Sequence, residues 1–86
     1  MFVPRRPEAF EETTVNECRH YAEHPDSVTA DSTLAQLKID QLDVVMFMSD
    51  LEKIFGVEFT DDEIFEIAAG TLRKIAATFL AKAIAA

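Results

Sequence analysis

The stretch that decides the fold runs from Ile39 to Gly56 and reads IDQLDVVMFMSDLEKIFG. Near its start, the Asp40 carboxylate can accept hydrogen bonds from the free backbone N–H groups of a first helical turn. Asp43 adds negative charge close to the positive end of the helix dipole. Gly56 suits the left-handed residue that closes many helices. The stretch therefore predicts one long helix that begins near Asp40 and ends before Gly56.

Apolar residues cover more than one face of this predicted helix. One set recurs with helical spacing and predicts a buried face: Val44, Phe47, Met48, Leu51 and Phe55. A second set lies beside that face at the helix start: Leu42, Val45 and Met46. A helix with so much apolar surface is either central to a core or presents surface to a partner.

The composition indicates one small all-α domain. The chain has 86 residues, of which 49% are apolar and 28% are charged. Two Gly and three Pro argue against long linkers and low complexity. No stretch alternates apolar and polar residues for long, so strands are not expected.

The formal net charge of −8 disfavours nucleic acid and anionic membrane surfaces as partners. The negative charge is uneven, because nine acids and one base, Lys53, lie between Asp40 and Glu66. Such a field either steers a basic partner protein toward this half of the chain or is simply a solvated acidic face.

Targeting signals are not evident in the sequence. No apolar run is long enough to span a bilayer, and no apolar segment follows Arg5 and Arg6 as in a signal peptide. The single cysteine, Cys18, has no partner for an internal disulfide. Together these features favour a cytoplasmic protein.

The remaining elements follow from local signals. Residues 1–7 are expected to form a loose N-terminal arm, and residues 8–86 a single domain. We expect helices over residues 8–22 and 61–68 and a last helix after Thr71, with Pro7 at the first helical position and Thr60 and Glu63 as a capping box. A short helical turn at 31–37 is expected to direct Leu34 and Leu37 into the core. Three residues of the short helix are candidates for the core: Ile64, Phe65 and Ile67.

Chemistry that would indicate an enzyme or a metal site is weak in this sequence. His20 and His24 are one helical turn apart, but no third ligand has convincing spacing for zinc. Asp61 and Asp62 fit a helix start better than an acid–base pair. We therefore expect a non-enzymatic protein without a metal.

The order of these features resembles the acyl carrier protein family over roughly residues 8–82. The family is an acidic four-helix bundle with three longer helices and a short third one, and its second helix starts with Asp-Ser-Leu. Here Asp40-Gln41-Leu42 occupies that place, and residues 43–59 are similar to the family's second helix and the loop after it. Residues 31–37, 60–63 and 71–79 resemble the corresponding segments on either side.

The resemblance implies that position 41 is where the family attaches 4'-phosphopantetheine. Attachment needs a hydroxyl oxygen, which attacks the phosphorus of the coenzyme and remains as a phosphodiester. Gln41 carries an amide, so no phosphopantetheine is expected on this chain. Ser32 is the nearby substitute, but it lies too early, and Ser49 lies well inside the helix.

The resemblance also implies docking to partner enzymes through the second helix. Asp40 and Asp43 are kept, whereas Met46 stands where an acid is common. The residues expected to contact a partner with a basic or apolar surface are Asp40, Leu42, Asp43, Val45 and Met46. The alternative is that Leu42, Val45 and Met46 only complete the fold, for example against the loop at 24–33.

Three functions remain open at this point. The first is a carrier-like docking protein of fatty-acid, polyketide or related acyl metabolism that carries no covalent acyl chain. The second is a true carrier that uses another serine, or whose natural serine was replaced at position 41. The third is a plain interaction domain. A non-covalent acyl ligand is also conceivable, in a cavity lined by Phe47, Met48, Ile64, Phe65 and Ile67.

Overall fold

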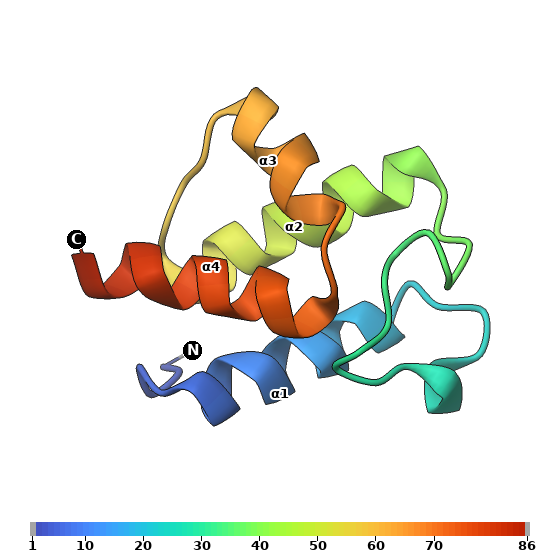
Figure 1. Cartoon of the computed structure of the whole chain (residues 1–86), viewed down its shortest axis with the longest axis horizontal. Helices are drawn as coiled ribbons and strands as arrows, with labels where there is room; N and C mark the ends of the chain where they lie inside the picture. The colour runs from blue at the N-terminus through green and yellow to red at the C-terminus, as the bar shows by residue number, and fades with distance from the viewer. Residues whose placement is uncertain (1, 86) are drawn as a thin grey trace.

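Figure 1 shows a computed structural model of the chain, which describes residues 2–85. Four α-helices follow one another: α1 (Pro7–Arg19), α2 (Gln41–Phe55), α3 (Asp61–Ala68) and α4 (Leu72–Ala85). A single 3₁₀ turn, η1 (Pro25–Ser27), lies between α1 and α2. Within residues 2–85 there is no strand, only an isolated antiparallel bridge between Thr33 and Thr71. The prediction of an all-α bundle with three longer helices and a short third one is confirmed.

The three longer helices run side by side, with their directions visible in Figure 1. α1 and α4 are antiparallel and pack mainly against each other, and α2 lies behind them and runs opposite to α1. The short α3 sits across the outside of α2 and α4.

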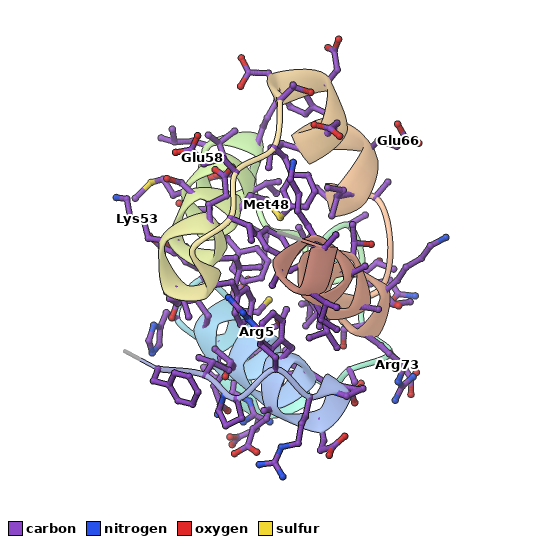
Figure 2. The ribbon with its side chains drawn as sticks, turned by 90° about the vertical axis from the view of Figure 1, so that its left-hand side faces the viewer. Arg5, Met48, Lys53, Glu58, Glu66 and Arg73 are labelled. Carbon is purple, nitrogen blue, oxygen red and sulfur yellow. The ribbon has the colours of Figure 1, made fainter. Side chains whose placement is uncertain are left out.

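Side chains from α1, α2 and α4 build the core. The largest ones that are almost wholly removed from solvent are Phe10, Phe47, Met48, Leu51, Leu72, Ile75 and Phe79. The Phe10 and Phe55 rings are stacked, with centroids 4.0 Å apart, and join the two helices at one end of the bundle. Figure 2 shows Met48 in the interior between the helices. The predicted inner face of α2 is confirmed, except that Val44 is only half-buried.

The helix ends agree with most of the predicted signals. Pro7 is the first residue of α1, as predicted. α1 ends at Arg19, not at residue 22, because the N–H groups of His20 and Tyr21 bond to carbonyls three residues back and tighten the chain. The Thr60–Glu63 capping box at the start of α3 is present.

Phe65 is not a core residue, so that prediction was wrong. Its side chain is 52% exposed, while Ile64 and Ile67 are half-buried against the core. α3 has eight residues and lies on the outside of the bundle, so only one narrow stripe of it faces inward.

The predicted helical turn at residues 31–37 is present as a single turn, in which the Leu37 N–H donates to the Thr33 carbonyl at 3.2 Å, and it does not extend into a helix. Leu34 is buried as expected, whereas Leu37 is only half-buried. At the other end of the chain, Val3 in the predicted arm packs against the core.

No helix within the described part of the chain is both long and apolar enough to cross a membrane.

Candidate functional site

The start of α2 is a capped helix end with an exposed first residue. The Asp40 side chain accepts a hydrogen bond from the Asp43 N–H at 2.9 Å, as predicted for a cap. Gln41 is the first helical residue, and its side chain is exposed to solvent. A group attached or bound at this position would therefore be open to another protein.

The turn before α2 is held by a left-handed residue. Lys38 has φ of +56°, the one positive value among the non-glycine residues that the structure describes. The Lys38 N–H bonds to the Ala35 carbonyl, and the Ile39 N–H bonds to the Leu34 carbonyl. These two bonds form a Schellman motif, which usually has glycine at the left-handed position. The motif directs the chain into Asp40 and so fixes where α2 begins.

The long connection between α1 and α2 is anchored to the start of α4. The backbone N–H groups of Leu72 and Arg73 donate to the carbonyls of Ser32 and Ala30, each at 2.9 Å. The Arg73 guanidinium also pairs with Asp31 and, at 3.5 Å, with Glu11 of α1. These contacts join three segments that are far apart in sequence, and Figure 2 shows Arg73 at the edge where they meet.

Three apolar side chains are exposed on the first two turns of α2, and we call them the α2 patch. Leu42 is 70% exposed, Val45 43% and Met46 47%. The alternative that they complete the fold does not agree with this exposure. Asp40 is exposed and Asp43 is half-buried beside them. The structure thus brings together all five residues that the sequence singled out for docking.

The two serines considered as substitutes for position 41 are poorly placed for modification. Ser32 is half-buried, and its Oγ accepts a hydrogen bond from the Thr29 N–H at 3.0 Å. Ser49 is half-buried in the middle of α2. The side-chain amide of Gln41 has no hydroxyl oxygen, so this position does not fit a phosphodiester-linked group.

Four of the five side chains that were expected to line an acyl cavity belong to the core or pack against it: Phe47, Met48, Ile64 and Ile67. Phe47 and Met48 are wholly buried, and Phe65 faces solvent. Ile67 lines a groove of about 450 Å³ between α3 and α4, together with Phe59 and Lys74. Phe65 is therefore excluded from such a cavity, and binding of an acyl ligand by the other four residues stays a prediction.

Other reactive groups are placed for structural roles. The Cys18 thiol is wholly buried, and burial raises its pKa to about 11, which keeps it protonated and unreactive at neutral pH. His20 lies 3.7 Å from Glu17 and is otherwise exposed. Among residues 2–85 no three His, Cys, Asp or Glu side chains are grouped to hold a metal ion.

An acidic cluster that the sequence did not suggest joins α1 to α2. The Tyr21 hydroxyl donates to the Asp50 carboxylate, and this bond raises the pKa of Tyr21 to about 12. Burial, followed by the neighbouring Asp50, raises the pKa of Glu17. The side chains come from α1, from the turn that follows it and from α2, so spacing along the sequence could not reveal their proximity.

Comparison with known families decides the identity of the fold. The model of the family described as "Phosphopantetheine attachment site" matches residues 18–79, well over half of the chain. The chain belongs to this family. No curated protein and no solved structure matches the chain.

Membership of the phosphopantetheine attachment family makes this an acyl-carrier-like protein. Domains of this family carry groups for enzymes and are not themselves catalysts. The matched segment contains the capped start of α2 and the α2 patch.

Proposed function

We propose that this protein docks on enzymes of fatty-acid, polyketide or related acyl metabolism without itself being phosphopantetheinylated. The observation that carries the proposal is the start of α2. There an exposed glutamine follows directly on the capping aspartate, beside an exposed apolar patch. Gln41 thus stands at the attachment position that the family resemblance implies, and its amide does not serve that chemistry.

The α2 patch supports a docking role on energetic grounds. Burying one side chain of this size against a partner contributes about 1.5–3 kcal/mol, and a flexible methionine adapts to varied surfaces. Asp40 and Asp43 at its edge favour a partner with basic groups around an apolar centre. Charge therefore contributes less to docking on this surface, and apolar contact more, than on a helix that carries only acidic side chains.

Binding to purified ketosynthases and acyltransferases tests the docking half of the proposal. Leu42→Asp and Met46→Asp are expected to weaken binding by about tenfold or more, because each removes one buried apolar contact. Ile84→Asp is the matched control, because Ile84 is 63% exposed on α4, away from the patch. Equal losses for all three variants, or no binding by the unaltered chain to any of these enzymes, would contradict the proposal.

The modification half is tested by intact mass after incubation with a phosphopantetheinyl transferase and coenzyme A. The proposal predicts no adduct on the unaltered chain. A true carrier that uses Ser32 or Ser49 predicts an adduct that Ser→Ala variants at those positions remove. The half-buried positions of both serines favour the first outcome.

A further inference from the structure

An apolar groove with two cations lies at the opposite end of α2 from the α2 patch. It has a volume of about 550 Å³, within the range of about 300–1,000 Å³ that small-molecule sites occupy. Its apolar lining consists of Phe2, Val3, Phe10, Ile54 and Phe55. The groove lies about 15 Å along α2 from the patch, given the rise per residue of a helix.

The floor of this groove is preformed. Phe10 and Phe55 are 2% and 7% exposed, and their stacked rings are held in the core between α1 and α2. A rigid apolar floor loses little entropy when a ligand settles on it. Phe2 at the lip is 84% exposed, so an aromatic ring is available to cover a ligand.

The charge of the groove is opposite to that of the protein. Arg5 and Lys53 line it, and no Asp or Glu of residues 2–85 does, although acids outnumber bases sixteen to eight in the chain. Neither cation forms an ion pair with a carboxylate in the described part of the chain. Figure 2 looks onto this end of the molecule, with Arg5 between α1 and the last turn of α2 and Lys53 at the outer edge of α2. An anion at the rim would therefore meet two cations, of which Lys53 also lines a second hollow with Glu52 and Glu58.

We infer that this groove binds a single-chain amphiphile with an anionic head group, such as a fatty acid, reversibly and without covalent attachment. The alkyl chain lies against Phe2, Val3 and Ile54, above the buried Phe10–Phe55 pair, and the carboxylate meets Arg5 and Lys53. The size of the groove favours a small molecule over a protein, which would need about 800 Å² of surface on this partner. This inference is independent of the proposed docking function, because it uses none of the α2 patch.

A tryptophan at the lip gives a direct readout, because the chain contains no Trp. In a Phe2→Trp variant, titration with monomeric dodecanoate at pH 7.5 is expected to give a saturable blue shift in emission. The carboxylate is ionised at this pH. Calorimetry on the unaltered chain is expected to give the same dissociation constant, which excludes an effect of the substitution itself.

Two double variants with the same change in net charge separate local contact from general electrostatics. Arg5→Gln with Lys53→Gln is expected to weaken dodecanoate binding about tenfold, because two charge-assisted contacts are lost. Arg6→Gln with Lys74→Gln alters two cations that do not line the groove, and it is expected to leave binding unchanged. Dodecanol, which lacks the charge, is expected to bind about tenfold more weakly than dodecanoate.

Three results would overturn the inference. The first is no saturable binding of dodecanoate by either readout. The second is an equal loss in the two double variants. The third is tighter binding of an oligoglutamate peptide than of dodecanoate, which would assign the groove to a protein partner.

Discussion

Substitution by alanine is expected to have opposite effects on the free energy of unfolding at Gly56 and at Gly70. Gly56 closes α2 with φ of +70°, and a Cβ atom there would meet nothing within 4 Å, so an alanine would suffer only from the backbone conformation. The left-handed conformation destabilises the folded state by about 1–2 kcal/mol for an L-residue. Alanine also lowers the conformational entropy of the unfolded chain, which stabilises the folded state by about 0.4–1 kcal/mol. Gly56→Ala is therefore expected to lower the free energy of unfolding by about 1 kcal/mol.

Gly70 is the matched control, because it does not adopt a positive φ. A Cβ atom there would lie 3.4 Å from Cδ of Lys74, an ordinary contact with a flexible side chain. Gly70→Ala is expected to raise the free energy of unfolding by about 0.4–1 kcal/mol.

Thermal unfolding followed by circular dichroism distinguishes these outcomes. For a domain of this size, 1 kcal/mol shifts Tm by about 4–8 °C, so Gly56→Ala is expected to lower Tm by that amount and Gly70→Ala to raise it by a few degrees. The same shift in both variants would show that backbone conformation at Gly56 does not decide the effect and would refute the reasoning.

Three further predictions concern the ends of α2 and the acidic cluster. Asp40→Ala is expected to cost about 1 kcal/mol in urea denaturation through loss of the cap, with a smaller loss for Asp61→Ala, an acid that caps nothing by its side chain. Lys38→Val is expected to cost about 1–3 kcal/mol because a β-branched residue resists positive φ, whereas Lys38→Gly is tolerated; equal effects would contradict this. Burial, followed by Asp50, raises the pKa of Glu17 above its ordinary value of 4.5, so folding is less favourable when Glu17 is ionised. The free energy of unfolding is therefore expected to rise as the pH falls through this raised pKa toward 4.5. Glu17→Gln is expected to raise the urea midpoint at pH 7 and to remove this part of the pH dependence, and an unchanged pH profile would contradict the assignment.

The helix boundaries were largely predictable because short-range chemistry sets them. Asp40, Thr60 and Gly56 each act on backbone groups within one turn, so their identities are enough to predict their roles. The end of α1 was not predictable in the same way. The position of Pro25 predicts that the helix continues to residue 22. The N–H groups of His20 and Tyr21 instead bond to carbonyls three residues back, so the helix ends earlier.

Contacts between distant segments were beyond sequence reasoning. Phe65 has the same helical spacing as a core residue, and only the placement of α3 on the outside of the bundle shows that it is exposed. The Arg5–Lys53 groove and the Tyr21–Asp50 hydrogen bond each join residues from different elements. The α2 patch was predictable because its three residues lie on one helix and beside a face that the apolar spacing had already assigned to the core.

The measurement that bears most directly on the role of this carrier fold is the intact mass of the unaltered chain and of Gln41→Ser. Both are incubated with a phosphopantetheinyl transferase and coenzyme A under the same conditions. We predict that the unaltered chain gains no mass and that Gln41→Ser gains the mass of one phosphopantetheine group. A stoichiometric adduct on the unaltered chain would contradict the proposal that this protein docks without carrying the cofactor.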